Sequence, residues 1–330
     1  MPTVVSLIDP AARPTVLPED ALATLGEAGW TVIHRPWKRR EAAQAAEWIG
    51  PNASAVLCTW GAPTFTPSLL DALPNLRFIG YCAGSVKHLV TPDVFARGVA
   101  VASAAPVIAR AVGEYCLAAT LWHLRGLQAM TRDLAGVNGA PRWSRHPARS
   151  LYGQRVGIIS ASTTARCFID LLRPFDCDVL VYDPYLQEPF RLGVRVGSLS
   201  DVCAQTVVSV HTPDLPATRG LVGAAELAQI PDGGLFINSA RSAVVNTEAL
   251  LRALRTGRFH AVLDVFPTEP LPPDSPFAGL PNVTLSPHTA GFSTDIYAQM
   301  GREIVADLLR WQAGDPMRLS VDAARWELLA

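Results

Sequence analysis

Short apolar runs of strand length alternate with helical stretches along this chain, and this alternation restricts the possible folds more than any other feature. The runs are rich in valine, isoleucine and leucine, as the buried strands of a parallel sheet are. Strands that alternate with helices predict βαβ units, and therefore parallel sheets covered by helices. The predicted strands are Thr3–Ile8, Thr31–His34, Ala55–Thr59, Leu76–Tyr81, Val99–Ser103, Arg155–Ser160, Asp178–Asp183, Val194–Gly197, Val207–His211, Gly234–Asn238, Ala261–Phe266 and Val283–Ser286.

Between these strands lie segments whose apolar residues recur at helical spacing. The predicted helices include Pro18–Ala28, Arg40–Trp48 and Ser293–Ala313. A longer helical segment with an apolar face runs from about Val107 to Leu134. It is followed by Asn138–Pro147, which is rich in glycine, proline and arginine and is predicted to be a loop or linker. With 330 residues, the chain is long enough for two domains of ordinary size.

Composition excludes several classes of function. The net charge of −1 and the isoelectric point near 6.7 leave no basic field for nucleic acid or an anionic membrane. No stretch approaches the roughly 18 consecutive apolar residues of a membrane span, and the amino terminus does not resemble a signal peptide. Six scattered cysteines without a Cys-x-x-Cys pair predict free thiols in a reducing compartment. We therefore expect a cytoplasmic protein without nucleic-acid or membrane partners.

Three polar clusters in the last third of the chain carry residues suited to proton transfer. They are Asn238–Arg241, Asp264–Pro270 and Ser286–Gly291. Each begins at the end of a predicted strand, so we expect its side chains at the edge of the sheet where open α/β folds bind ligands. A fixed cation, a histidine that moves a proton and a carboxylate that orients it are what interconversion of a carbonyl and an alcohol requires. The arrangement indicates a dehydrogenase.

With their flanking motifs, these clusters resemble the NAD-dependent D-2-hydroxyacid dehydrogenase family. The resemblance extends over residues 100–292, and the first hundred residues match more loosely. The additional matching motifs are His211–Asp214, Thr218–Leu221, Asp274–Pro276 and Leu280–Val283, with Leu73–Leu76 and Ala83–Gly84 in the first hundred residues.

The resemblance implies two doubly wound parallel-sheet α/β domains, with a Rossmann cofactor domain inserted into a flavodoxin-like substrate domain. On that basis, residues 1–105 and 294–330 form the substrate domain, and residues 106–293 form the NAD-binding domain. It also implies a small 2-hydroxyacid or 2-ketoacid as the substrate. Family members usually dimerise through the cofactor domain, so a homodimer is expected, and the apolar segment 107–134 suits that use.

Catalytic roles are implied residue by residue. His288 would be the acid/base, and Glu269 would hold its imidazole and stabilise the protonated ring. Arg241 would bind the substrate carboxylate and polarise the carbonyl. Asp264 resembles the residue that bonds the nicotinamide carboxamide, with a helix-capping or turn role as the alternative. A lone histidine past a strand is more often structural, but three matching clusters in one order favour catalysis.

The cofactor loop is where the sequence departs from the family. After the strand Arg155–Ile159 the family has Gly-x-Gly-x-x-Gly, and here all three glycines are replaced in Ser160-Ala161-Ser162-Thr163-Thr164-Ala165. The Cβ of Ser162 would point where the pyrophosphate lies. In compensation, the hydroxyls of Ser162, Thr163 and Thr164 at a helix amino terminus can bond phosphate. The alternative is a nucleotide site reduced to a helix N-cap.

The remaining cofactor contacts lie on neighbouring strands. Asp183 ends the strand that follows the loop, at the offset of the acid that binds the adenosine ribose. Its carboxylate would accept from the 2′-hydroxyl and repel a 2′-phosphate, which favours NAD over NADP; a turn role before Pro184 is the alternative. The other cofactor-binding residues implied by the resemblance are Thr212, Pro213, Thr218 and Ala240.

Substrate contacts are also expected in the first domain. The residues implied are Ala83, Gly84, Ser85 and Val86, and the backbone amides of the last two could bind the substrate carboxylate. Lys87 and His88 replace the residues usual in the family. They either bring positive charge for a substrate with a second acidic group or are solvated loop residues.

Further departures lie on the cofactor side. Near Arg241, Ser242-Ala243 and Asn246 replace two glycines and an aspartate. His211 lies either beside the cofactor or in the core. The other histidines show no metal-ligand spacing, so no metal is expected.

Two classes of function remain open at this point. The first is a dehydrogenase, which the presence of Arg241, Glu269 and His288 favours. The second is a non-catalytic, dehydrogenase-like binding or regulatory protein with a weakened nucleotide site, which the missing glycines favour.

Overall fold

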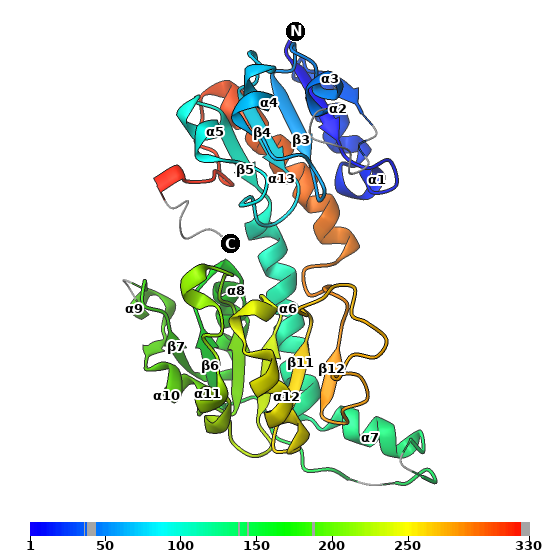
Figure 1. Cartoon of the computed structure of the whole chain (residues 1–330), viewed down its shortest axis with the longest axis vertical. Helices are drawn as coiled ribbons and strands as arrows, with labels where there is room; N and C mark the ends of the chain where they lie inside the picture. The colour runs from blue at the N-terminus through cyan, green and yellow to red at the C-terminus, as the bar shows by residue number, and fades with distance from the viewer. Residues whose placement is uncertain (36, 38–43, 138, 144, 187–188, 325–330) are drawn as a thin grey trace. The chain divides into compact units, whose positions relative to one another are not determined.

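The computed structural model describes the chain except for residues 36, 38–43, 138, 144, 187–188 and 325–330. The chain folds into two compact units (Figure 1). Unit 1 consists of Met1–Ile108 and Phe292–Ala330, and unit 2 consists of Ala109–Gly291. Each unit is built around one parallel sheet.

The sheet of unit 1 has the strand order β2-β1-β3-β4-β5, which is the flavodoxin-like order. All of its strand pairs are parallel, which confirms the predicted fold class. Apolar residues of α3, α4 and α5 pack on one face, and those of α1, α2 and α13 pack on the other. The elements are β1 (Thr3–Leu7), α1 (Arg13–Val16), α2 (Glu19–Glu27), β2 (Thr31–His34), α3 (Ala45–Ile49), β3 (Ala55–Cys58), α4 (Pro67–Asp71), β4 (Phe78–Tyr81), α5 (Pro92–Ala96), β5 (Ala100–Ser103) and α13 (Thr294–Ala313).

Close packing of α13 on unit 1 depends on a glycine. A Cβ at Gly301 would overlap the backbone oxygen of Val16 in α1. Any larger side chain would therefore push the two helices apart, which explains why α13 carries glycine at a buried position in spite of the weak helix propensity of that residue.

The sheet of unit 2 has the order β12-β11-β10-β9-β6-β7-β8. Counted from β6, this order contains the 3-2-1-4-5-6 arrangement of a Rossmann fold, as predicted. Apolar residues of α10, α11 and α12 form the core on one face. The elements are α6 (Ala105–Leu124), α7 (Leu127–Leu134), β6 (Arg155–Ile159), α8 (Thr163–Leu172), β7 (Asp178–Tyr182), α9 (Pro189–Leu192), β8 (Arg195–Val196), α10 (Leu199–Cys203), β9 (Val207–Val210), α11 (Ala224–Gln229), β10 (Leu235–Asn238), α12 (Thr247–Arg255), β11 (His260–Leu263) and β12 (Val283–Leu285), with short 3-10 helices at Arg173–Phe175, Pro216–Thr218 and Ser242–Val244.

One helical prediction needs correction, and another falls partly outside the described residues. The long segment from Val107 to Leu134 consists of two helices, because Gly126 between them adopts the left-handed region with φ of 65°. The predicted helix Arg40–Trp48 corresponds to α3 at its carboxyl end, whereas residues 40–43 lie outside the described part of the chain. Among the helices that the structure describes, none has the length and hydropathy needed to cross a membrane.

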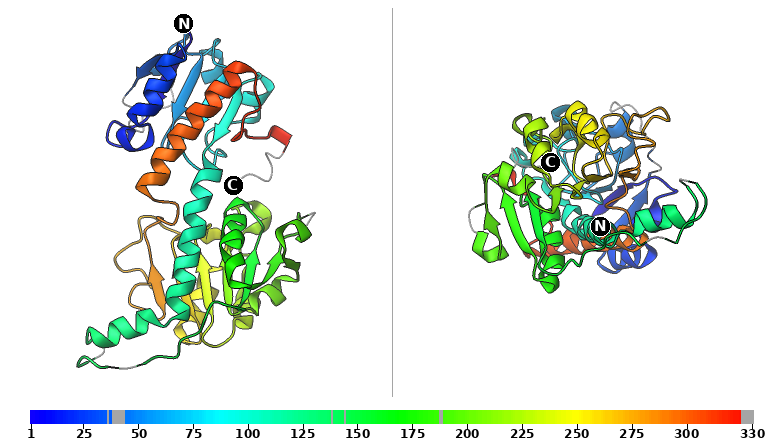
Figure 2. Two further views of the ribbon diagram at one scale, coloured as in Figure 1. Left: turned by 180° about the vertical axis from the view of Figure 1, so that it is seen from behind. Right: turned by 90° about the horizontal axis from the view of Figure 1, so that it is seen from below.

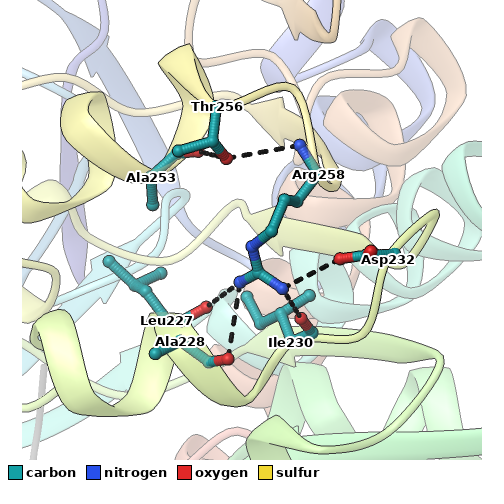
Figure 3. Close-up of polar contacts among 7 residues, drawn as sticks. All are labelled: Leu227, Ala228, Ile230, Asp232, Ala253, Thr256 and Arg258. Carbon is teal, nitrogen blue, oxygen red and sulfur yellow. Dashed lines mark hydrogen bonds and ion pairs between the residues drawn. The ribbon is translucent and has the colours of Figure 1, made fainter.

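Arg258 ties the end of α11 to the turn before β11 (Figure 3). Its guanidinium donates to the backbone oxygen of Ile230 and to the carboxylate of Asp232, both at 3.0 Å. It also donates to the oxygens of Leu227 and Ala228 at 3.4 Å. These carbonyls belong to the carboxyl end of a helix, where a cation is favourable.

Candidate active site

An imidazole and a carboxylate form a pair at the carboxyl edge of the unit 2 sheet. Nδ1 of His288 lies 2.7 Å from Oε2 of Glu269. The other oxygen of Glu269 accepts a hydrogen bond from the backbone N–H of Phe266 at 2.9 Å, which fixes the carboxylate. The His288 side chain is 51% exposed. Because Nδ1 is occupied by the carboxylate, Nε2 is the ring nitrogen placed to exchange a proton with a substrate.

Glu269 is ionised near neutral pH. Partial burial raises its pKa, but the hydrogen bonds from His288 and from Phe266, and the charges of His288 and Arg241, lower the pKa by more, so the net shift is downward. A carboxylate that is charged near neutral pH fixes the orientation of the ring and stabilises a proton on it.

The loop that carries His288 is anchored by the buried carboxylate of Asp264. Oδ1 of Asp264 accepts from Ser286 Oγ at 2.6 Å and from the backbone of Thr289 at 2.8 Å, and Oδ2 accepts from the backbone of Ala290 at 2.8 Å. His288 itself has a φ of 55°, a strained conformation that these bonds hold in place. Asp264 was expected to bond the nicotinamide carboxamide; its contacts in the structure are with this loop.

Tyr115 of α6 extends the same network, and the sequence alone did not reveal it. Its hydroxyl lies 2.6 Å from Oγ of Ser286, which in turn donates to Asp264. Burial raises the pKa of Tyr115 to about 12, so the phenol is protonated. It can therefore donate to Ser286 while Ser286 donates to Asp264.

Arg241 follows β10, the strand beside β11, and β12 lies on the other side of β11. This strand order explains why three clusters far apart in sequence meet at one edge. The side-chain amide of Asn238 donates to the backbone oxygen of Arg241 at 3.0 Å and accepts from Ala240 N–H at 3.2 Å, which fixes the turn. Nη1 of Arg241 donates to the oxygen of Ala240 at 2.7 Å.

The loop between β6 and α8 keeps the conformation of a tight turn without glycine. Ser160 adopts a φ of 72°, and its hydroxyl lies 2.9 Å from that of Thr212. Both oxygens of Asp183 accept backbone hydrogen bonds at 2.8 Å, one from Ala161 and one from Tyr185. Asp183 thus braces the loop from the end of β7, and its contact with the adenosine ribose stays a prediction.

The amino terminus of α8 fits an anion. Ser162 is the N-cap residue, and in the described structure its side chain makes no capping hydrogen bond to the helix. The first N–H groups of α8 therefore remain available to an acceptor outside the helix, which is the arrangement that binds phosphates. Oγ of Ser162 instead lies 3.0 Å from Oγ1 of Thr164. These donors fit the pyrophosphate of a dinucleotide.

The predicted cofactor residues of the loop after β9 hold this loop through one hydrogen bond to β6 and one within the loop. Thr212 is buried and donates to the backbone oxygen of Ile159 at 3.1 Å. The Thr218 hydroxyl donates to the oxygen of Pro213 at 2.6 Å. His211 is buried, and both of its ring nitrogens have hydroxyl partners.

The predicted substrate residues of unit 1 form the turn after β4. The Ser103 hydroxyl donates to the oxygen of Gly84 at 2.6 Å, and the backbone N–H of Lys87 donates to the hydroxyl of Ser85 at 3.3 Å. His88 is exposed, and its imidazole lies 3.2 Å from the hydroxyl of Tyr81, the last residue of β4. Ala83 and Val86 are buried, while Gly84 and Ser85 are partly exposed.

Comparison with known proteins decides the family. The model of the D-isomer specific 2-hydroxyacid dehydrogenase NAD-binding domain matches residues 117–290, just over half of the 330 residues. The chain belongs to the D-isomer specific 2-hydroxyacid dehydrogenase family. The match confirms the predicted family and NAD as the cofactor of the matched domain.

Relatives and solved structures agree with this assignment. D-3-phosphoglycerate dehydrogenase of Haemophilus influenzae is 30% identical over 307 residues, which are 89% of this chain and 72% of the relative. Glyoxylate reductase of Korarchaeum cryptofilum is 27% identical over 255 residues, 75% of this chain and 76% of the relative. The solved structure of a phosphoglycerate oxidoreductase from Rhizobium etli has a TM-score of 0.79 and 25% identity, covering 98% of this chain and 99% of that one.

The family also contains longer chains. The chain spans about half the length of several other curated relatives that it matches. D-3-phosphoglycerate dehydrogenase of Mycobacterium tuberculosis, for example, is 28% identical over 274 residues, which are 80% of this chain and 50% of that relative.

Proposed function

We propose that this protein is an NAD-dependent oxidoreductase that interconverts a small 2-hydroxyacid and its 2-ketoacid. The observation that carries the proposal is the 2.7 Å contact between His288 and an ionised Glu269. The charge of Arg241 acts on the same carboxylate, so an acid/base pair and a cation lie together at the edge of one sheet.

In the direction of ketoacid reduction, His288 delivers a proton from Nε2 to the carbonyl oxygen of the substrate. Glu269 holds the ring through Nδ1 and stabilises its charged form before transfer. Arg241 binds the substrate carboxylate with its planar guanidinium and polarises the carbonyl. Bound NADH supplies the hydride. Asp264 keeps the His288 loop in its strained conformation.

NAD would be held by the residues of unit 2 that surround the β6–α8 loop. Ser162, Thr163 and Thr164 would form the pyrophosphate site together with the N–H groups of α8. Asp183 would bind the adenosine ribose and disfavour the 2′-phosphate of NADP. The remaining proposed contacts are Thr212, Pro213, Thr218, Ala240 and Asp264.

We assign residues 106–293 to the NAD-binding domain, and residues 1–105 with 294–330 to the substrate domain. In the substrate domain, the turn Ala83–Val86 would bind the substrate through its backbone amides. The relatives named above act on phosphoglycerate or glyoxylate according to their names, which supports a small acid as the substrate class.

We also propose a homodimer that forms through unit 2, in the cytoplasm. Helix α7 projects from the rest of unit 2 (Figures 1 and 2). Large apolar side chains are exposed along this region, which favours a protein interface. All six cysteines are free, which supports a reducing compartment. The exposed apolar residues of α7 and the segment after it are Leu127, Leu134, Val137 and Trp143, and Trp122 is exposed on the preceding helix α6.

A screen of small 2-ketoacids with NADH, followed by the loss of NADH absorbance, tests the proposed function. We expect at least one ketoacid to be reduced, with NADH preferred to NADPH. If NADH binds but no 2-ketoacid or 2-hydroxyacid is turned over, the protein is instead a non-catalytic relative that binds nucleotide.

A further inference from the structure

Hydrogen bonds between side chains connect the cofactor loop to the core of unit 2. Oγ of Ser162 lies 3.0 Å from Oγ1 of Thr164, and Oγ1 of Thr164 lies 3.0 Å from Nδ1 of His211. On the other side of the ring, Nε2 of His211 lies 2.9 Å from Oγ of Ser209. His211 is 3% exposed and Ser209 is fully buried. We refer to these four residues as the hydroxyl–imidazole chain.

The tautomer of His211 sets the direction of the whole hydroxyl–imidazole chain. Burial lowers the pKa of His211 to about 3, so near pH 7 the ring is neutral and carries one N–H. With that N–H on Nε2, the ring accepts from Thr164, and the Ser162 hydroxyl hydrogen is directed inward to Thr164. With the N–H on Nδ1, the ring donates to Thr164, Thr164 donates to Ser162, and the Ser162 hydroxyl can donate to a ligand.

At Ser209, the inner end of the hydroxyl–imidazole chain, both directions of the hydrogen bonds are possible at little cost in free energy. Ser209 donates to Sγ of Cys116 at 3.8 Å, which corresponds to the Nε2–H tautomer of His211. A thioether or thiol sulfur is a weak acceptor, so turning the Ser209 hydroxyl toward Nε2 sacrifices only a weak bond. Sγ of Cys116 also lies 3.5 Å from Oγ of Ser239, so the thiol keeps a second partner in either arrangement.

A bound pyrophosphate favours one of the two directions. Phosphate oxygens only accept hydrogen bonds, and a donor aimed at an ionised oxygen forms a stronger bond than a neutral pair does. The side chain of Ser162 occupies the place of the second glycine of the family loop. Its hydroxyl can replace the lost backbone approach only if its hydrogen is directed outward.

We propose that His211 is a positioning residue of the NAD site, and that bound pyrophosphate selects its Nδ1–H tautomer so that Ser162 donates to a phosphate oxygen. This inference rests on the proposed function, because it requires a dinucleotide at the amino terminus of α8. Thr164 transmits the effect. The ring gives up the proton on Nε2 and binds another on Nδ1 by exchange with solvent, so the net number of protons on the protein does not change.

The binding test uses two substitutions of Thr164 that differ in one group. Thr164→Val removes the hydroxyl at nearly constant shape, and Thr164→Ser retains it. We expect Thr164→Val to weaken binding of ADP-ribose by roughly tenfold in calorimetry, and Thr164→Ser to restore it. Adenosine, which lacks the pyrophosphate, should bind all three proteins alike, which separates a lost phosphate contact from a disturbed fold.

A double variant tests whether Ser162 and Thr164 act as one unit. Ser162→Ala removes the donor itself and should weaken ADP-ribose binding at least as much as Thr164→Val does. The variant that carries both substitutions should bind no more than about twofold more weakly than Ser162→Ala alone, because Thr164 acts on the phosphate only through the Ser162 hydroxyl. Additive losses would contradict the coupling.

The tautomer is measured in the unaltered protein by nitrogen-15 NMR of labelled histidine, with His211→Gln used to identify the His211 signals. We expect the N–H of His211 to move from Nε2 to Nδ1 on saturation with ADP-ribose, and to stay on Nε2 with adenosine. The inference is overturned if the N–H stays on the same nitrogen with ADP-ribose, or if Thr164→Val binds ADP-ribose as the unaltered protein does. If the unaltered protein binds neither NADH nor ADP-ribose, the proposed function fails as well.

Discussion

The buried carboxylate of Asp264 accepts a hydrogen bond from the backbone N–H of Thr289 at 2.8 Å, immediately after His288. It thereby fixes the backbone of the residue that carries the acid/base chemistry. The position of His288 thus depends on a buried carboxylate at the end of β11 as well as on Glu269.

Asp264→Asn should lower both stability and turnover. The amide retains one acceptor oxygen, but its NH₂ group would face backbone N–H donors that need an acceptor. We expect the free energy of unfolding to fall by about 1–3 kcal/mol, and kcat to fall because the His288 loop shifts. Urea unfolding and steady-state kinetics measure the two effects. Ser286→Ala, which leaves the two backbone bonds in place, is the control and should have the smaller effect.

Glu269→Gln should shift the pH dependence of ketoacid reduction to the acid side. The fold lowers the pKa of Glu269 below its ordinary value of 4.5, so the carboxylate is charged at every pH above 4.5. Its stabilising contribution is lost only as the pH falls through the lowered pKa. The neutral amide removes this charge from the side of His288. An unchanged pH–rate profile in the variant would argue against an electrostatic role for Glu269.

The free energy of unfolding should decrease on mild acidification, because His211 is buried as a neutral ring. Burial lowers the pKa of His211 from 6.5 to about 3, so the unfolded chain binds more protons between these values. The contribution of His211 to the free energy of unfolding is therefore fully present above pH 6.5. It decreases as the pH falls below 6.5, by at most about 1.4 kcal/mol per pH unit. Urea unfolding between pH 7.5 and pH 5.5 measures the slope, and His211→Gln should reduce it.

Asp183→Ala should change cofactor preference. Removal of the carboxylate abolishes both the ribose acceptor and the charge that repels a 2′-phosphate, so NADH should bind more weakly and the difference between NADH and NADPH should narrow. Fluorescence titration of both nucleotides measures the ratio of the affinities for NADH and NADPH. A ratio equal to that of the unaltered protein would mean that Asp183 serves only to brace Ala161 and Tyr185.

The sequence predicted the sheets and the edge where the candidate residues meet, because both depend on local pattern. Buried parallel strands are apolar throughout, and polar residues begin where each strand ends, so Arg241, Glu269 and His288 could be placed from their positions alone. The break at Gly126 was missed because the apolar pattern continues through it, and a glycine within a helical pattern is only a weak signal.

The supporting contacts could not be predicted, because they join residues that are distant in sequence. Tyr115 and Ser286 are 171 residues apart, and Thr164 and His211 are 47 apart. Each pair depends on which helix packs on which strand end, and no short motif encodes that. For the same reason the sequence could suggest a histidine in the core at position 211, but not that its ring bonds the cofactor loop.

Turnover of His288→Ala with a reducible 2-ketoacid tests the central claim most directly. The alanine cannot deliver a proton, whereas the NADH site does not include this side chain. The account predicts that kcat falls by roughly 10²–10⁴ while NADH affinity measured by fluorescence is nearly unchanged. Turnover close to that of the unaltered protein would contradict the assignment of His288 as the acid/base.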